Sequence, residues 1–496
     1  MQHRRVGRRH VGGGGRSIRC GIAAVCLALL IVGCGNSTVI GGRALSMAYD
    51  PYRAGGLPAA DGPSGVRPNA PRVTGTVSNT DNGPIDQLAQ LGINDIEDFW
   101  GKKFPEAFHA KFKPVSKLIS YDSESRSGPS VCGGQSYGRV NASYCINDDV
   151  MAWDRGVLMP VVKEYFEDMA VIAVLAHEYG HAVQWSAKLV NKRTPTVVDE
   201  QQADCFAGVY LRWVAEGKSP RFALSTGDGL NYVLAGVVAS RDPVLTPDDS
   251  DLLEEGHGTA LDRVGAFQIG FDEGAERCAK IDMNDIKTRR GDLPMSLQVD
   301  SQGRVQSGDV PITADLLSEV MKAMDRIFAP ANPPTLTMDP AQCADARASD
   351  PVSYCPSTNT ISANLPALQE LGRAANEVED EVLVKGDNSA ISLLMSRYTL
   401  AVQRERNVAL TSGSAALRTA CLTAVAQRKL ADSNGSGQSS LTPSAGDVDE
   451  AVSGLLTNGL VASDVNGETV PAGFTRILAY RLGLSGEADA CFVRFA

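Results

Sequence analysis

The chain contains an internal repeat, and this repeat limits the folds that it can adopt. Four sequence blocks of the first half recur in the same order in the second half, and three of them contain cysteines. The corresponding segments are 132–145 and 343–355, 174–184 and 393–403, 203–205 and 419–421, and 263–278 and 476–491. Chance similarity between two helical stretches would not also reproduce the cysteines. The repeat therefore predicts two copies of one domain in a chain of 496 residues.

The cysteines divide evenly between the two copies. Of eleven cysteines, Cys20, Cys26 and Cys34 lie near the N-terminus, and each copy contains four of the other eight. An even number outside the cytoplasm indicates a disulfide framework. Pairing within each copy is the simplest hypothesis, although other pairings stay open. The predicted pairs are Cys132–Cys145, Cys205–Cys278, Cys343–Cys355 and Cys421–Cys491.

The N-terminal segment has the pattern of an export signal. Its first nineteen residues include six arginines and no acidic residue, and an apolar run follows at 21–33. The run ends in Ile31-Val32-Gly33-Cys34, which is similar to the cleavage site of lipoprotein signal peptides. We therefore predict a signal peptide at 1–33, a lipidated Cys34 and a protein anchored outside the cytoplasm at the cell membrane. An uncleaved N-terminal anchor is the alternative.

Charge limits the partners of the exported protein. Removal of the six N-terminal arginines changes the formal net charge from −11 to −17. Such an acidic body argues against binding to nucleic acid or to an anionic membrane surface. A lipid on the N-terminus would hold the protein at the membrane instead.

Composition and hydrophobic patterning divide the rest of the chain. Residues 34–84 are rich in Gly, Pro and Ser and read as a flexible tether. The first copy is expected at 85–283, a polar linker at 284–309 and the second copy at 310–496. Within the first copy we expect helices at 93–104, 161–189 and 198–214, strands at 116–121 and 142–153, and a last helix ending near Cys278.

The helix expected at 161–189 contains His177-Glu178-Tyr179-Gly180-His181. This spacing places two imidazoles one turn apart on one helix face, where both can bind Zn²⁺, and Glu178 can take a proton from a water molecule at the metal. The preceding residues 171–176 are all apolar, so this helix is expected to be buried. Two core histidines without a metal are the alternative.

Glu200 and Asp204 lie four residues apart on the next expected helix and share one face. Glu200 is the candidate third zinc ligand, and Asp204 can accept the second N–H of a ligand histidine. A solvated acidic turn at the start of a helix is the alternative. His257, in Glu255-Gly256-His257-Gly258-Thr259, is a candidate donor to the oxyanion of a tetrahedral intermediate, and a surface loop histidine is an equal alternative. His109 reads as an ordinary surface residue.

The second copy lacks all six of these side chains. In the order His177, Glu178, His181, Glu200, Asp204 and His257, its counterparts are Ser396, Arg397, Leu400, Ala416, Ala420 and Val470. The cysteines and an arginine (Arg263 and Arg476) are present in both copies. This contrast suggests that the six residues form one site and that the arginine belongs to the scaffold. The second copy is expected to bind no zinc by this route.

The first copy resembles the bacterial neutral zinc metallopeptidase family over about residues 93–281. The matching blocks are Cys132, Tyr144-Cys145, 177–184, 200–208, 257–259, Arg263, Gly270-Phe271 and Cys278. The chain departs from the family pattern at Ala182, where a second histidine is common, and at Ile146-Asn147, where proline is usual. With its lipoprotein signal and second half, it is similar to a mycobacterial-type lipoprotein peptidase. The resemblance implies a zincin-like α+β fold with zinc bound by His177, His181 and Glu200.

Together these features predict a lipid-anchored zinc endopeptidase acting on a peptide or protein of the cell envelope. The strand near 150–153 is a candidate for binding substrate by strand addition. Two alternatives stay open: an envelope binding or scaffold protein with a structural zinc, and an active peptidase whose second copy binds a partner. The sequence leaves the oligomeric state open.

Overall fold

The computed structural model describes residues 37–40, 43–46, 49–249, 251–291, 293–299, 302–305, 308–340, 342–376, 383–432 and 441–496. The chain divides into two compact units, Met1–Met47 and Ala48–Ala496. The described residues of the first unit form one antiparallel hairpin of β1 (Ser37–Ile40) and β2 (Arg43–Ser46). The predicted signal peptide and Cys34 lie outside the described residues. No helix of the described chain is both long enough and apolar enough to cross a membrane.

In the second unit, the first half of the chain combines one mixed sheet with a layer of helices. The sheet has the order β10 (Ala142–Cys145), β11 (Val150–Asp154), β7 (Lys117–Tyr121) and β6 (Val77–Ser78). β10 is antiparallel to β11, whereas β11, β7 and β6 run parallel. Every residue of β11 is buried, as expected for an apolar strand covered on both faces. This arrangement confirms the predicted mixed α+β class.

The principal helices of this half are α1 (Pro84–Phe108), α2 (Leu158–Ala187) and α3 (Thr196–Ala215). The all-apolar segment 171–176 buries α2 between the sheet and its neighbouring helices. Gly180 brings α2 close to α3, because a Cβ at this position would collide with the backbone of Ala203. Tyr179, next to it, is anchored by hydrogen bonds to Val115 N (3.2 Å) and Glu97 Oε1 (3.0 Å). These contacts fix the segment that carries the predicted motif.

Five further helices complete the first half: α4 (Asp228–Ala239), α5 (Leu252–Glu255), α6 (Ala260–Glu273), α7 (Ala275–Cys278) and α8 (Met283–Arg290). Thr259 and Asp262 form a capping box that fixes the start of α6. At Gly270, α6 crosses α3 so closely that a Cβ would collide with the carbonyl oxygen of Cys205. The shorter strands are β3 (Arg53–Ala54), β4 (Leu57–Pro58), β5 (Gly65–Val66), β8 (Ser130–Val131), β9 (Gly134–Gln135) and β12 (Phe222–Ala223).

The second half has its own sheet, of order β13 (Thr335–Thr337), β15 (Thr360–Ala363) and β14 (Val352–Cys355). As in the first half, the edge strand is antiparallel and the other pair is parallel. Its helices are α9 (Ala314–Phe328), α10 (Leu365–Leu371), α11 (Asp387–Glu405), α12 (Gly413–Asp432), α13 (Asp447–Thr457), α14 (Gly473–Ser485) and α15 (Ala488–Arg494). All four predicted disulfides are present: Cys132–Cys145, Cys205–Cys278, Cys343–Cys355 and Cys421–Cys491.

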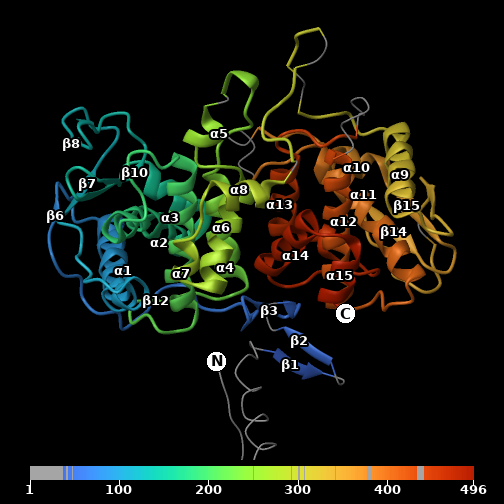
Figure 1. Cartoon of the computed structure of the whole chain (residues 1–496), viewed down its shortest axis with the longest axis horizontal. Coiled ribbons are helices and arrows are strands. Elements are labelled where there is room, and N and C mark those ends of the chain that lie inside the picture. The colour runs from blue at the N-terminus through green and yellow to red at the C-terminus, as the bar shows by residue number, and fades with distance from the viewer. Residues whose placement is uncertain are drawn as a thin grey trace, which may run out of the picture. The chain divides into compact units, whose positions relative to one another are not determined.

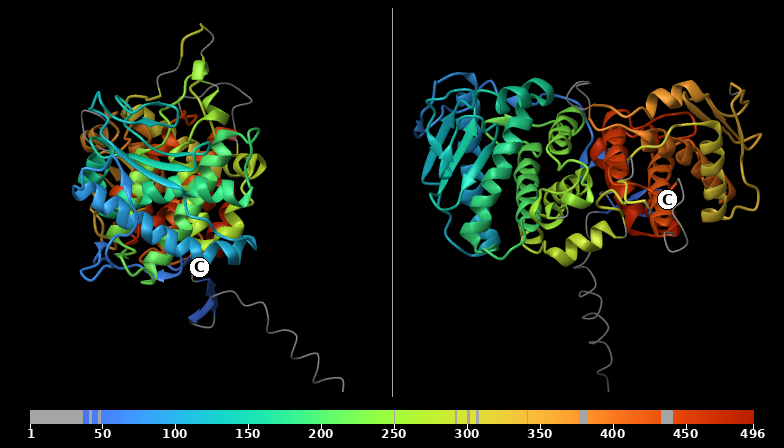
Figure 2. Two further views of the ribbon diagram at one scale, coloured as in Figure 1. Left: turned by 90° about the vertical axis from the view of Figure 1, so that its left-hand side faces the viewer. Right: turned by 90° about the horizontal axis from the view of Figure 1, so that it is seen from above.

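The two halves lie side by side (Figures 1 and 2). One hydrophobic core includes residues of both halves, and the second half has a further core of its own. Helices α4 and α6 of the first half contact α13 and α14 of the second. The rings of Phe271 and Phe474 lie 5.1 Å apart, and Gln268 Nε2 donates to the carbonyl oxygen of Phe474 at 2.7 Å. The halves therefore form a single packed body from residue 49 onward.

Two predicted segment boundaries are wrong. The tether expected at 34–84 is packed from residue 49 onward: β5 pairs with β12, β6 joins the main sheet, and Ala54 is completely buried. Strand pairing and the burial of Ala54 fix this segment on the larger domain, although Tyr52, Val66 and Val73 stay exposed. The linker expected at 284–309 begins inside α8, where Asp282 caps the helix and Ile286 is fully buried.

The strand expected at 142–153 is a hairpin of two strands, β10 and β11, because residues 146–149 form a turn. β11 lies between β10 and β7, so both of its backbone edges are already paired. The prediction that residues 150–153 bind substrate by strand addition is therefore wrong. The edge strands of this sheet are β10 and the two-residue β6, and β10 is the edge that contacts α2.

Candidate metal centre

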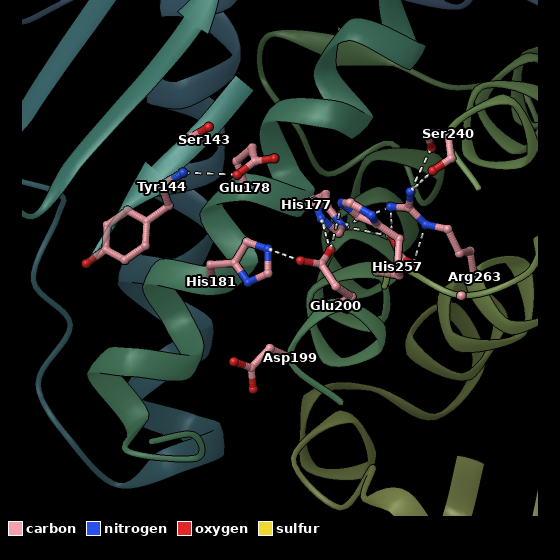
Figure 3. Close-up of polar contacts among 12 residues, drawn as sticks. Ser143, Tyr144, His177, Glu178, His181, Asp199, Glu200, Ser240, His257 and Arg263 are labelled. Carbon is pink, nitrogen blue, oxygen red and sulfur yellow. Dashed lines mark hydrogen bonds and ion pairs between the residues drawn. The ribbon is translucent and has the colours of Figure 1, made fainter. Parts of the chain in front are cut away.

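Three side chains meet where α2 faces α3. His177 and His181 project from one face of α2, and Glu200 projects from α3 toward both (Figure 3). Glu200 Oε2 lies 3.1 Å from His177 Nε2, and Glu200 Oε1 lies 3.6 Å from His181 Nε2. One ligand atom from each residue lies within 4.8 Å of the others. The structure thus brings together all three predicted ligands.

The second nitrogen of each imidazole has its own partner. His177 Nδ1 lies 2.8 Å from Asp204 Oδ1, and His181 Nδ1 lies 3.0 Å from Gln184 Oε1. The Gln184 amide is oriented by its donation to the Asp199 carbonyl oxygen at 2.5 Å. Since both acceptors favour a proton on Nδ1, the lone pairs of both Nε2 atoms point toward the Glu200 carboxylate.

This donor set fits Zn²⁺, which binds histidine nitrogen and carboxylate oxygen. Two nitrogen lone pairs facing a carboxylate repel it unless a cation lies between them. Glu200 Oε2 is buried, and apart from His177 Nε2 at 3.1 Å it has no hydrogen-bonding partner in the described chain. Such an atom costs free energy unless it has a positive partner. The three side chains also leave a fourth tetrahedral position free, as catalytic zinc sites do.

The pKa shifts of the same groups indicate that the site favours positive charge. Burial opposes protonation of His177, but the carboxylates of Asp204 and Glu200 outweigh it and raise the pKa of His177 to about 10. Burial also opposes ionisation of Glu200, but His181 and His177 hold its pKa below the usual range. Metal binding would displace the proton, because a ligand histidine must be neutral.

Asp204 is held by Arg263, which projects from α6. Arg263 Nε and Nη2 lie 2.9 and 2.8 Å from the two carboxylate oxygens, and Nη1 donates to Ser240 Oγ at 3.0 Å. Both residues are buried. Burial raises the pKa of Asp204, but Arg263 and then His177 outweigh it and lower this pKa to about 2. The ion pair therefore keeps Asp204 charged next to His177.

Glu178 projects from α2 toward the sheet rather than toward α3. Its Oε2 accepts a hydrogen bond from the backbone N–H of Tyr144 on β10 at 3.0 Å. Burial raises the pKa of Glu178, although His177 and His181 oppose this shift. A carboxyl group whose pKa moves toward neutrality is suited to accept a proton and release it again. Glu178 thus lies between the candidate ligands and a free strand edge.

His257 lies at the rim of the site, between α5 and α6. Its Nε2 is 3.8 Å from Glu200 Oε2, and its Nδ1 is 3.3 Å from Asp242 Oδ1. The side chain is 54% exposed, so it can meet a ligand that enters from solvent. The hydrogen bond that His257 donates to Asp242 raises the pKa of His257, against the effect of partial burial. His109, by contrast, is exposed at the end of α1.

Sequence reasoning missed three residues that complete the site: Arg263, Asp242 and Gln184. Arg263 was assigned to the scaffold because it recurs as Arg476, yet its guanidinium contacts Asp204 directly. Asp242 has no motif around it, and only the fold brings it beside His257. Gln184 lies three residues after His181, so the shared helix face was a usable signal.

The corresponding positions of the second half contain no ligand cluster. Arg397 is buried at the position of Glu178 and donates to the carbonyl oxygen of Val352 on β14 at 3.1 Å and to Ser463 Oγ at 2.9 Å. Ser396 Oγ donates to the carbonyl oxygen of Leu393 at 2.6 Å. Arg476 donates to the carbonyl oxygen of Leu456 at 3.1 Å and forms no ion pair with a described residue. The guanidinium of Arg397 thus occupies the space between α11 and the strand β14.

The fold and these side chains define a mixed α+β protein with a two-histidine, one-glutamate centre of the zinc-peptidase type. The model of the family described as "putative neutral zinc metallopeptidase" matches residues 1–281, and the chain belongs to this family. The match ends at the residue where the sequence resemblance was expected to end, and it extends further toward the N-terminus. No curated protein and no solved structure matches the chain.

Proposed function

We propose that the first half of the chain is an endopeptidase that uses zinc held by His177, His181 and Glu200. The convergence of these three side chains, with Glu178 directed at the adjacent strand edge, carries this proposal. A centre of three protein ligands favours catalysis, because structural zinc sites are usually closed by four. The rival function as a scaffold with a structural zinc would not require Glu178.

A zinc ion in this centre supplies a Lewis acid that lowers the pKa of a water molecule. Glu178 accepts a proton from the attacking water and passes it to the leaving amine. The N–H of Tyr144 holds the Glu178 carboxylate in place for both transfers. Asp204, fixed by Arg263, orients His177. His257 donates from Nε2 to the oxyanion that develops on the substrate.

An extended substrate is proposed to pair with β10, the edge strand next to Glu178. The backbone of β10 and the carboxylate of Glu178 are in direct contact, so a strand added here would bring its peptide bonds to the proton-transfer group. The substrate class is therefore an unfolded segment or loop of an envelope protein. The backbone N–H and C=O groups of an unfolded segment are unpaired, so they can form hydrogen bonds with β10.

We propose that the protein is a lipoprotein, anchored through Cys34 and exposed outside the cytoplasm. Four disulfides support an oxidising compartment. Replacing Cys34 with alanine and fractionating the cells tests the anchor. Loss of the protein from the membrane fraction is expected, whereas unchanged fractionation with an uncut N-terminus would contradict lipidation.

The second half is proposed to be a degenerate, non-catalytic copy of the first. Three observations support this: its edge strand is antiparallel as in the first half, its disulfides join corresponding elements, and Gly483 packs on Cys421 as Gly270 packs on Cys205. Arg397 replaces the proton-transfer group with a cation that cannot accept a proton.

The decisive experiment compares Glu178→Gln with a His177→Ala/His181→Ala double variant on an unstructured protein such as casein. Glu178→Gln is expected to keep one zinc per chain and lose peptide cleavage by at least about 10²-fold, the range of general acid–base catalysis. The double variant is expected to lose both zinc and cleavage. Cleavage retained by Glu178→Gln would remove this residue from the mechanism and favour a different site.

A further inference from the structure

A second group of acidic side chains, separate from the candidate zinc centre, lies where the N-termini of α11 and α13 meet. One carboxylate oxygen from each of Asp309, Asp387 and Glu450 lies within 4.8 Å of the others. Asp387 and Glu450 are buried, at 3% and 6% exposure, whereas Asp309 is exposed. An ion could thus reach the group from solvent through Asp309.

Helix capping accounts for only part of this cluster. Asp309 Oδ1 accepts the N–H of Asp387 at 3.1 Å, and Glu450 Oε2 accepts the N–H of Asn388 at 2.9 Å. A fourth carboxylate, that of Asp447, is satisfied by Ser444 at 2.6 and 3.0 Å. A helix N-terminus carries roughly half a positive charge. Two N-termini therefore offset only about one of the four negative charges.

No described lysine, arginine or histidine forms an ion pair with Asp387, Asp447 or Glu450. Buried carboxylates normally have such a partner or bind a metal. The buried carboxylates of Asp387, Asp447 and Glu450 therefore have no cationic side chain as a partner in the described chain.

One carboxylate oxygen of Asp387 has no hydrogen-bond partner and is available to a cation. Asp387 Oδ2 accepts the N–H of Val310 at 2.9 Å, whereas Asp387 Oδ1 is buried and has no hydrogen-bond partner. Gly386 lets the carboxylates of Asp309 and Glu450 approach its backbone closely, because a Cβ there would collide with both. Its φ of −169° is one that any residue adopts, so space is the reason for a glycine here. A cavity of about 250 Å³ lined by Asp387 and Asp447 provides room for water ligands.

We propose that Asp309, Asp387 and Glu450 bind a calcium ion at the junction of α11 and α13. Carboxylate oxygens without histidine or cysteine favour a hard cation over zinc. Calcium accepts irregular sets of six to eight oxygens, whereas magnesium requires near-octahedral geometry. This site is independent of the peptidase proposal, because it shares no residue with the zinc centre.

The ion would also stabilise the contact between the two halves. The first turn of α13 carries Glu450 and, beside it, Asp449, whose Oδ1 accepts the N–H of Leu261 on α6 at 3.4 Å. Asp449 Oδ2 lies 3.4 Å from Arg241 Nε. A bound ion would hold this turn in place, and with it the contact between Asp449 and Leu261. Leu261 lies on α6, the helix that carries Arg263.

Calcium binding is tested on the full-length chain carrying Glu178→Gln, so that protection from self-cleavage cannot imitate binding. The protein is passed over chelating resin, its zinc content is confirmed by mass spectrometry, and calcium chloride is added in a calorimeter. One equivalent should bind with a dissociation constant of about 10⁻⁴ to 10⁻³ M, as in extracellular calcium modules. Magnesium should bind at least tenfold more weakly, and equal binding would overturn the assignment to calcium.

Asp387→Asn and Glu450→Gln should each weaken calcium binding at least tenfold. Asp315→Asn, which removes one exposed carboxylate from the start of α9, should leave binding unchanged. In calcium-free buffer Asp387→Asn should melt at a higher temperature than the parent, because it relieves repulsion, and this shows that the variant folds. Absence of binding at 10 mM calcium (on the order of ten times the weakest expected constant), or binding unaffected by both variants, would overturn the proposal.

Discussion

Arg263 holds both carboxylate oxygens of Asp204, with Nε–Oδ2 and Nη2–Oδ1 distances of 2.9 and 2.8 Å. Asp204 in turn lies 2.8 Å from His177 Nδ1, so the orientation of a candidate ligand depends on a residue from α6. These contacts link His177 on α2 through Asp204 on α3 to Arg263 on α6. Zinc affinity should therefore respond to substitutions that do not touch the metal.

Arg263→Lys is predicted to lower zinc affinity about 10- to 100-fold, the usual effect of losing a partner of a ligand histidine. A single ammonium cannot bind both oxygens of Asp204 and Ser240 as the guanidinium does. Competition with a chromophoric chelator measures the affinity. Arg476→Lys is the matched control, because Arg476 is an equally buried arginine without a carboxylate partner in the described chain. Equal losses in both variants would point to the fold rather than to Asp204.

The purified chain is predicted to contain one zinc, and His177→Ala is predicted to contain none. Ser396, Leu400 and Ala416 offer no imidazole or carboxylate at the corresponding positions of the second half. Mass spectrometry after dialysis against metal-free buffer counts the bound ion. Ser396→Ala serves as the control and should retain the parental content. A second zinc that survives in His177→Ala would contradict the prediction.

Gly270→Ala is predicted to destabilise the protein by about 1–3 kcal/mol or more, the cost of overpacking. The added methyl would collide with the carbonyl oxygen of Cys205, and Gly483→Ala meets Cys421 in the same way. Urea denaturation measures both losses, but only Gly270→Ala should also lower zinc content, because α6 carries Arg263. Gly454→Ala is the control: nothing lies within 4 Å of its Cβ position, so this helical site should gain up to about 1 kcal/mol.

Asp449 is predicted to make the protein less stable as the pH rises from about 4 to 6. Burial, opposed by Arg241, raises its pKa from 3.8 to about 6 in the folded state. Because the folded form binds the proton more tightly, the stabilisation is complete below pH 3.8 and is lost as the pH rises through 6. The loss amounts to at most about 3 kcal/mol. Asp449→Asn should flatten this slope in urea titrations at pH 4 to 7; parallel slopes for the two proteins would refute the assignment.

The sequence predicted those parts of the molecule that repeat a local pattern. The 3.6-residue spacing placed His177 and His181 on one face, and the recurrence of four cysteines in each half led to the four disulfides that the structure contains. The neighbouring acidic pair on α3 faces the same site, because α2 and α3 pack closely at Gly180. These features depend on helix geometry, which the spacing of residues encodes directly.

The errors concern segments whose state depends on a distant partner. Residues 49–84 look flexible by composition, but β6 is stabilised by pairing with β7 and β5 by pairing with β12. Likewise, the alternation at 142–153 identified strands but not the turn that makes β10 the edge. Arg263 was grouped with scaffold residues because Arg476 is also an arginine, although the two guanidinium groups have different partners. Pairing between strands that are distant in the sequence cannot be predicted from local periodicity.

The hydrophobic core that includes residues of both halves restricts which parts of the chain can be deleted. Phe271 packs on Phe474, and α4 and α6 are covered by α13 and α14. A shortened chain ending near residue 309 would expose that apolar surface to water and would aggregate before it could be tested for cleavage. The second half therefore supplies an apolar surface on which the first half packs, even though Ser396, Leu400 and Ala416 provide no metal ligand.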